Sequence, residues 1–417
     1  MLPEKLKDDV LAHALEALRG LENGKYMTLP FIKRWLEDTT ASTYDRIDSI
    51  PPSRNQTTQD VTPAGVFNTW PGFCAADLPL VQGDEVLPLV QPILDHIRNV
   101  ITGDEHLNYL LAWLAQQVQD PAQHTTVAIV LQGLEGVGKD IIFDFFLHKV
   151  LGDRVGFKTS NPKNDIFGEH SVALRDRVFL LVDEAKGDEI RPLMSRLKDL
   201  VTSSIMHVNP KNQPAYDVLN LANLLFTTNT SNPIQIDPQE RRFVVFECNS
   251  SKKDDARYFG FLFQYLQRDD VARAFFQYLC DDVDVSPFLP LQAHRPRTDA
   301  YITMQQRNIS SFFKFLSSEI QFALNVAQEE ASSIRADELF NKFKRWGVDG
   351  NYNVSNTTST TFGIDLGKLM TELKQADPSQ GVLTKRRQGT GNVYRVRWAE
   401  LQQHLERTAR YDPNAEG

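Results

Sequence analysis

Residues Thr126–Gly152 read TVAIVLQGLEGVGKDIIFDFFLHKVLG, and this stretch determines the fold. The apolar run Val127–Leu131 predicts a buried strand, and the apolar segment behind the glycines predicts a helix that ends near Gly152. Glycines and a lysine lie between the two, which is the pattern of a phosphate-binding P-loop. Glycines allow the backbone to approach phosphates closely, and N–H groups at a helix N-terminus hold the phosphate oxygens.

We expect this loop to bind ATP, with the ammonium group of Lys139 on the β- and γ-phosphates. The expected contact residues are Gly133, Leu134, Glu135, Gly136, Val137, Gly138, Lys139, Asp140 and Ile141. Asp140 departs from the pattern, because a Ser or Thr hydroxyl normally serves Mg²⁺ at this position. A carboxylate can also bind the metal, although it adds negative charge beside a polyphosphate. The alternative interpretation is an ordinary glycine turn between a strand and a helix.

The composition is that of a soluble globular protein, with 41% hydrophobic and 24% charged residues. A length of 417 residues predicts two or three domains. No apolar run is long enough to span a membrane and the N-terminus lacks a signal-type apolar core, so we expect a cytoplasmic protein without a membrane partner. Three scattered cysteines argue against a disulfide framework and against a zinc site. The net charge of −9 does not indicate nucleic-acid binding, but a ring can be acidic outside and basic in its channel.

A second apolar run, Val178–Val182, is followed directly by Asp183 and Glu184. Such a run predicts a strand that is buried on both faces, and its carboxylates emerge at the carboxyl end, where α/β sheets bind ligands. We expect Asp183 to hold Mg²⁺ and Glu184 to be the base that activates the attacking water. The alternative is a core strand that ends in a solvated acidic turn.

Two further buried strands bring other polar candidates. Asn223–Asn229 ends in an asparagine that we expect to hold the attacking water and sense the γ-phosphate. Arg241 and Arg242 precede the strand Phe243–Glu247, where one of them can reach the γ-phosphate of a neighbouring subunit as an arginine finger. The alternative is that both arginines are structural ion-pair donors. With a short strand at 155–158, these runs predict a five-stranded parallel sheet.

The flanks of these strands are mostly helical in pattern. Helices are predicted at 3–24, 31–36, 85–102, 105–119, 191–203 and 253–283, with an irregular connection at 49–69. Residues 205–218 predict a hairpin with Lys211 at its Pro-Lys-Asn-Gln-Pro tip. A lone lysine at such a tip is usually only solvated.

The C-terminal region predicts three helices followed by a basic hairpin that turns at Gly389-Thr390-Gly391, an order that suggests a winged-helix-like domain. Residues 385–397 hold five basic residues and no acid, which suits phosphate contacts. We take Lys385, Arg386 and Arg387 as candidates for DNA binding. The alternative is a solvated hairpin on a packing domain.

Taken in order, these segments resemble the superfamily 3 helicases, the AAA+ branch of P-loop ATPases in DNA viruses, phages and plasmids. The likeness is strongest to the helicase part of phage and viral primase-helicases. The segments that carry it are Gly133–Asp140, Asp183-Glu184, Lys198 through the Lys211 hairpin, Thr228-Asn229, Arg241–Phe243 and, upstream, Phe67–Phe73 and Leu111–Ala115. The family implies a homo-oligomeric ring, usually of six subunits, with ATP between neighbours and hairpins lining a channel. On this resemblance Lys211, Asn212 and His207 contact the DNA backbone, and the ring moves 3′ to 5′ on single strands.

The expected fold is therefore α/β, with an AAA+ P-loop ATPase core. The expected divisions are a helical N-terminal region at 1–120, the ATPase domain at 121–285, a linker at 286–307 and the winged-helix-like domain at 308–417. The implied function is an ATP- and Mg²⁺-dependent helicase on single-stranded or forked DNA, in replication of a phage, virus or mobile element inside a bacterial host cell.

Two alternatives remain open at this point. The first is a non-processive AAA+ DNA-binding ATPase, such as an initiator, loader or defence switch. The second, a kinase-type phosphotransferase, gives Asn229 and the arginine pair no obvious use. The first 60 residues are too few for a primase domain, so we expect primase or polymerase activity in a longer parent chain or in a partner.

Overall fold

The computed structural model describes residues 43–414, except 54–55, 169–171, 213, 238, 351, 378–380 and 390. The helices predicted at 3–24 and 31–36 lie outside the described residues. The stretch expected to be an irregular connection contains local structure, because strand β1 (Arg46–Asp48) pairs in parallel with β2 (Val66–Asn68) around the short helix α3 (Thr58–Val61).

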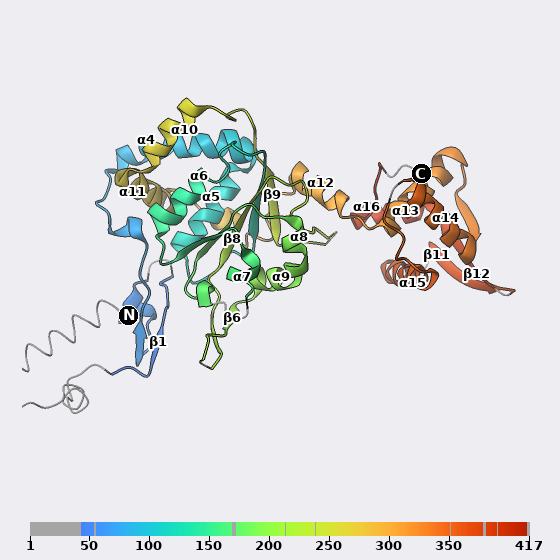
Figure 1. Ribbon diagram of the computed structural model, residues 1–417, viewed down its shortest axis with the longest axis horizontal. Helices are drawn as coiled ribbons and strands as arrows, with labels where there is room; N and C mark the ends of the chain where they lie inside the picture. Colours follow the sequence, from blue (N-terminus) through green and yellow to red (C-terminus); the bar gives the residue numbers. More distant parts are fainter. Residues whose placement is uncertain are drawn as a thin grey trace, which may run out of the picture.

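A five-stranded parallel sheet forms the centre of the molecule (Figure 1) and confirms the predicted α/β core. Its strands are β3 (Ala128–Gln132), β4 (Gly156–Thr159), β5 (Phe179–Val182), β8 (Asn223–Thr228) and β9 (Phe243–Glu247). They lie in the order β4-β5-β8-β3-β9, and all four neighbouring pairs are parallel. Strand β8 therefore separates the strand before the P-loop from the strand before the acidic pair.

Alternate residues of each central strand enter two different cores, because successive side chains of a strand point to opposite faces. In β3, Ile129 and Leu131 enter one core, whereas Ala128 and Val130 enter the other. This is why the strands read as continuous apolar runs.

Helices cover both faces of the sheet (Figure 1). The first face carries α4 (Gly83–His96), η2 (Ile97–Thr102), α5 (Gly103–Gln119), α6 (Ile141–Phe145), η3 (Phe146–Leu151), α10 (Ala256–Leu266), α11 (Asp269–Gln277) and η6 (Tyr278–Asp282). The second face carries α7 (Pro162–Asp165), α8 (Gly187–Ile190), η5 (Arg191–Leu193), α9 (Met194–Thr202) and α12 (Asp299–Arg307). In the described part of the chain, no helix is both long enough and apolar enough to traverse a bilayer.

The helix that leads into the P-loop strand belongs to the core of the sheet. Trp113 in α5 is fully buried, its indole N–H donates to the carbonyl of Val127 at 2.9 Å, and its ring meets the edge of Phe179. The expected boundary at residue 120 therefore does not separate two cores.

The expected linker at 286–307 also differs from the structure. It contains α12, whose Tyr301 and Met304 are buried in the second core. The Tyr301 hydroxyl donates to the carbonyl of Glu240 at 2.6 Å. Burial of these side chains attaches this segment to the sheet. The helix was not predicted because the sequence before it is rich in proline.

Two further units extend from the sheet (Figure 1). The predicted hairpin is present, with β6 (Ile205–Val208) antiparallel to β7 (Tyr216–Leu219). Beyond α12 lies a body with its own aromatic core. Its elements are α13 (Ser311–Gln321), η8 (Phe322–Val326), β10 (Ala331–Arg335), α14 (Ala336–Asp349), α15 (Ser359–Ala376), β11 (Leu383–Gln388), β12 (Gly391–Arg397) and α16 (Trp398–Arg407). Strand β10, which the sequence did not predict, completes a sheet of order β10-β12-β11.

Candidate functional site

The glycine loop lies between the end of β3 at Gln132 and the start of α6 at Ile141. Gly136 and Gly138 have φ angles of +77° and +81°, which residues that carry a side chain rarely adopt. A Cβ added to Gly138 would also lie 2.4 Å from the Phe259 ring. The loop therefore needs glycine at both positions, as a backbone-lined phosphate cradle does.

The buried side chain of His96 hydrogen-bonds to the backbone of this loop. His96 is fully buried in α4, and its Nε2 lies 2.8 Å from the carbonyl oxygen of Gly138. Its Nδ1 lies 2.8 Å from the hydroxyl of Tyr258. Because a carbonyl can only accept, Nε2 carries the proton and Nδ1 accepts from the tyrosine. Burial lowers the pKa of His96, although the Gly138 carbonyl opposes this, so the ring is neutral at pH 7. No sequence motif predicts this contact between His96 and the loop.

The side chains of Lys139 and Asp140, at the end of the loop, make no capping hydrogen bond to the helix. Lys139 Nζ lies 3.3 Å from the carbonyl oxygen of Leu134. Asp140 is the N-cap of α6, and its side chain makes no capping hydrogen bond. Both side chains can therefore turn toward a ligand at the loop without loss of a helix cap.

The acidic pair follows β5 at the same edge of the sheet. Asp183 accepts hydrogen bonds from the Thr227 hydroxyl at 2.6 Å and from the backbone N–H of Glu184 at 3.1 Å. Burial would raise the pKa of Asp183, but the Thr227 hydrogen bond and the ammonium of Lys158 outweigh it and hold the pKa below its usual value. The Asp183 carboxylate is thus charged and fixed in place.

Glu184 has a φ angle of +52° and an exposed side chain. Its backbone N–H also lies 3.2 Å from the Thr227 hydroxyl, which holds this uncommon conformation. A strained backbone of this kind is typical of functional positions.

Asn229 follows the carboxyl end of β8, at the same end of the sheet as the acidic pair. The backbone N–H of Gly133 donates to the carbonyl of Thr228 at 3.0 Å, so the start of the loop lies beside Asn229. Since Val182 is paired with Phe226, Asp183 lies level with Thr227. The fold therefore brings the loop, Asn229 and the acidic pair to one edge of the sheet.

Lys158 links the acidic pair to the P-loop helix. Its Nζ lies 2.8 Å and 2.9 Å from the two carboxylate oxygens of Asp144 and 3.2 Å from Oδ2 of Asp183. Burial disfavours the ammonium, but the Asp144 and Asp183 carboxylates outweigh it and raise the pKa of Lys158. The sequence predicts the strand that carries Lys158 but no role for its side chain.

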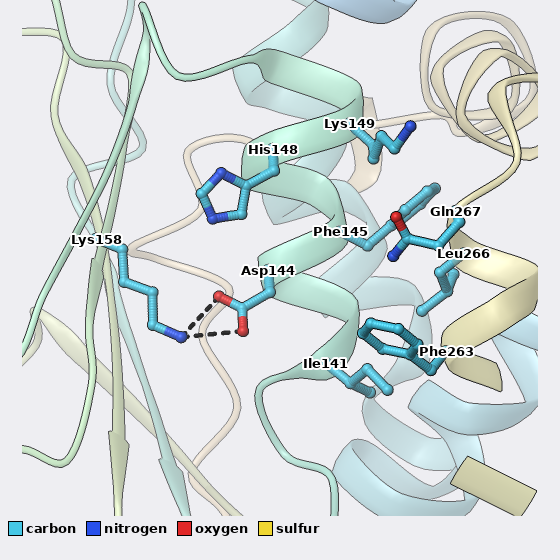
Figure 2. Close-up of a pocket in the computed structure, with 9 residues that line it drawn as sticks. All are labelled: Ile141, Asp144, Phe145, His148, Lys149, Lys158, Phe263, Leu266 and Gln267. Carbon is cyan, nitrogen blue, oxygen red and sulfur yellow. Dashed lines mark hydrogen bonds and ion pairs between the residues drawn. The ribbon is translucent and has the colours of Figure 1, made fainter. Parts of the chain in front are cut away.

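Figure 2 shows the ion pair between Lys158 and Asp144 beside the P-loop helix. Both residues line one side of a hollow of about 490 Å³. Phe263, Leu266 and Gln267 from the α10 side form the other wall. Lys149 points away from Lys158 and pairs with Asp269 at 3.1 Å.

Arg241 and Arg242, the candidate arginine fingers, lie at the amino end of the parallel strands, whereas the loop lies at their carboxyl end. The carbonyl of Arg242 accepts from the N–H of Ala128, the first residue of β3, whereas the loop follows its last residue. The five residues of β3, at about 3.3 Å each, separate the two edges by about 16 Å. Arg241 and Arg242 are therefore remote from the P-loop of their own chain.

The structure distinguishes the two arginines. Arg242 Nη1 lies 3.2 Å from Oε1 of Glu240, whose carboxylate is buried. Lys198 Nζ lies 2.9 Å from the other Glu240 oxygen and 2.6 Å from Asp237. Burial would raise the pKa of Glu240, but the hydrogen bonds from Lys198 and from the Arg242 backbone lower it overall. Arg241 is exposed. Arg242 is thus held in a structural network, while Arg241 can reach outward.

The candidate DNA-contact residues lie on the β6–β7 hairpin and on β11, and not on the central sheet. Lys211 and Asn212 are exposed at the tip of the β6–β7 hairpin. His207 Nδ1 lies 2.8 Å from the Asp217 carboxylate across the hairpin, so this imidazole already has an anionic partner. Lys385, Arg386 and Arg387 are exposed on β11 in the C-terminal body.

Parts of this chain are similar to known proteins. A family of unknown function (DUF5906) matches residues 131–242, the stretch that runs from the P-loop strand to Arg242. The DNA primase-polymerase of Nitratiruptor phage NrS-1 is 24% identical over 180 residues, which cover 42% of this chain and 24% of that protein. The chain thus matches about a quarter of the length of this curated relative.

Solved structures of the NrS-1 C-terminal region are similar over most of the chain. One apo structure has a TM-score of 0.55 at 16% identity and covers 93% of this chain and 90% of that one. The A-form apo structure also has a TM-score of 0.55 at 16% identity and covers 85% and 84%. The chain shares this fold.

Proposed function

We propose that this chain is an ATP-dependent DNA helicase that acts in the replication of a phage or related mobile element. The observation that carries the proposal is the meeting of the glycine loop, the Asp183-Glu184 pair and Asn229 at one edge of the sheet. The similarity to a phage primase-polymerase supports a replication context and a place of action in the bacterial cytoplasm.

In this proposal the loop from Gly133 to Ile141 holds the phosphates of ATP through backbone N–H groups, and Lys139 neutralises the β- and γ-phosphates. Glu184 accepts a proton from the attacking water, which Asn229 orients. The fixed charge of Asp183 suits it for a metal role.

Asp183 and Asp140 are the proposed holders of Mg²⁺. Within the described ranges no three His, Cys, Asp or Glu side chains gather into a metal site. This fits Mg²⁺, which is usually bound by one or two carboxylates together with substrate phosphates. When bound, the ion neutralises charge on the phosphate oxygens.

The proposed active form is a homo-oligomeric ring, six subunits by resemblance. The support is that Arg242, the neighbour of Arg241, bonds to the first residue of β3, whereas the loop follows the last residue of this strand, which is about 16 Å long. If Arg241 contacts a γ-phosphate, that phosphate is bound to another copy. We propose Arg241 as this finger, and Arg242 as its structural neighbour.

The proposed DNA path runs over the β6–β7 hairpin, with Lys211 and Asn212 on the backbone and movement 3′ to 5′ by resemblance. We also propose that residues 308–417 form a winged-helix-like domain. The order α13, β10, α14, α15, β11, β12 supports this, because two helices lie between β10 and the β11–β12 hairpin, whose strand β12 pairs with β10. Primase or polymerase activity would come from a longer parent chain or a partner.

A second candidate is a non-processive DNA-binding ATPase, such as an initiator or loader. The specific observation in its favour is the similarity to a phage protein named for priming and polymerisation.

One experiment separates these candidates. Fork unwinding and ATP hydrolysis are measured on the assembled protein, with and without single-stranded DNA. The proposal predicts strand separation that depends on ATP, and loss of the DNA-stimulated part of hydrolysis in Lys211→Ala. Hydrolysis without any strand separation would favour the initiator or loader.

A further inference from the structure

The strand register of the C-terminal sheet divides its basic residues between two faces. Arg395 of β12 lies opposite Thr384 of β11 and Ser333 of β10. Val393, two residues earlier, lies opposite Arg386 and Arg335. Directly opposite residues share a face, so these side chains all project from the same side of the sheet.

That side is the solvent side. Tyr394 and Val396, which alternate with Arg395 along β12, are buried in the aromatic core. Lys385 is paired with Tyr394 and therefore belongs to the core side, where its ammonium lies 5.9 Å from the centre of the Tyr394 ring. Arg387 lies two residues after Lys385 on β11 and therefore belongs to the same side of the sheet as Lys385.

Two of the four arginines on the solvent side are already paired with a carboxylate. Arg335 pairs with Asp337 at 3.1 Å, and Arg397 pairs with Glu400. Arg386 and Arg395 are exposed, and no acid of the described residues lies within ion-pair distance of either. The strands contribute no Asp or Glu to this side.

We propose that this solvent side, the arginine face (Ser333, Arg335, Thr384, Arg386, Arg395), binds the sugar-phosphate backbone of nucleic acid. Guanidinium groups recognise phosphate through paired N–H donors, and the hydroxyls of Ser333 and Thr384 add neutral donors. Arg335 and Arg386 flank Val393 at two strand spacings, about 9.6 Å apart. Arg395 lies two residues along β12, about 7 Å further. The three guanidinium groups thus cover an area rather than a point, as several successive phosphates require.

The inference deepens the proposed function because it rests on the proposed role on DNA, but it needs no ATP hydrolysis. It also revises the three candidates on β11, since it assigns the contact to Arg386 and leaves Lys385 and Arg387 outside it.

The hairpin offers a matched control for the test. Arg386→Gln/Arg395→Gln and Lys385→Gln/Arg387→Gln each remove two positive charges from the same hairpin, but from opposite sides. Binding of the full-length chain to a fluorescein-labelled single-stranded oligonucleotide, and to a duplex of the same sequence, is measured by anisotropy over a range of salt concentrations without nucleotide.

The inference predicts that the arginine-face variant binds at least tenfold more weakly at low salt. The slope of log affinity against log salt should fall by about 1.4 on the single strand or about 1.8 on the duplex, two phosphate contacts in either case. The control variant should change affinity less than twofold. Equal losses in both variants, or no loss in the arginine-face variant with unchanged thermal stability, would overturn the inference.

Hydrolysis of ATP by the wild-type chain is measured in parallel. A chain that binds DNA through the arginine face but hydrolyses no ATP refutes the proposed function and supports the inference. A chain that hydrolyses ATP and unwinds forks, but binds DNA equally well in both variants, supports the proposed function and overturns the inference.

Discussion

The ammonium group of Lys158 lies 3.2 Å from Oδ2 of Asp183. The same ammonium contacts both carboxylate oxygens of Asp144, so one cation from β4 joins the P-loop helix to the acid that ends β5. Asp140 brings a further carboxylate to the start of that helix. The positive charge of Lys158 therefore offsets part of the negative charge of the Asp144 and Asp183 carboxylates.

Lys158→Met should weaken ATP binding most in the absence of Mg²⁺. Without the ammonium, the carboxylates repel the phosphates, and a loss of about five- to tenfold in affinity is expected at these separations. Added Mg²⁺ should recover most of the loss, because it supplies the missing positive charge. The measurement is titration with a fluorescent ATP analogue in EDTA and in Mg²⁺.

Lys149→Met is the matched control, because Lys149 lines the same hollow but pairs with Asp269. Its ATP affinity should stay within twofold of wild type. A loss of equal size in both variants would mean that general surface charge, and not the bridge to Asp183, is responsible.

Glu184→Gln should separate nucleotide binding from hydrolysis. The amide keeps the size and the backbone conformation of Glu184 but cannot accept a proton, so turnover should fall by about 10²–10⁴ while ATP stays bound. Single-turnover hydrolysis and retention of ATP on a filter measure the two effects. Wild-type turnover in this variant would exclude Glu184 as the base.

The neutral state of His96 predicts a loss of stability in acid. Burial holds its pKa in the folded chain below the usual value of 6.5. The unfolded chain therefore takes up this proton first, and stability falls as the pH drops below about 6.5. Thermal unfolding between pH 5 and 7.5 should show this slope, and His96→Gln should reduce it. Burial also lowers the pKa of His124, so a part of the slope should remain.

If His96→Gln keeps the wild-type slope, the buried contact between His96 and the Gly138 carbonyl does not govern the acid response.

The sequence predicted the elements whose signal is local. The apolar runs of β3, β5, β8 and β9 gave the sheet, and the glycine loop gave the start of α6. The missed features depend on contacts between distant residues. His96 contacts Gly138 and Tyr258 at sequence separations of 42 and 162. A histidine on an apolar helix face has no pattern that reveals such partners.

The same reason explains the errors at the boundaries. Helix α12 follows a proline-rich segment, and only the burial of Tyr301 against the sheet shows that it belongs to the core. Strand β10 is short and mostly polar, and its pairing with β12 stabilises it. Neither feature was available from periodicity.

Arg242→Ala should destabilise the fold, whereas Arg241→Ala should leave its stability almost unchanged. Removal of Arg242 takes one of the cations from the buried Glu240 carboxylate and should cost about 1–3 kcal/mol of unfolding free energy. Removal of the exposed Arg241 should change it by less than about 0.5 kcal/mol. Denaturant titration measures both values. A larger loss in Arg241→Ala would contradict the assignment of Arg242 as the structural arginine.

The central claim is that the loop of one copy and Arg241 of another form a single ATP site. The most direct measurement mixes two variants, Lys139→Ala and Arg241→Ala, each of which should hydrolyse ATP poorly alone. In the mixture, the intact loop of the second variant can meet the intact arginine of the first, so hydrolysis should rise well above the sum of the separate activities. A mixture that stays as inactive as its components, although the two variants assemble together, would contradict the claim.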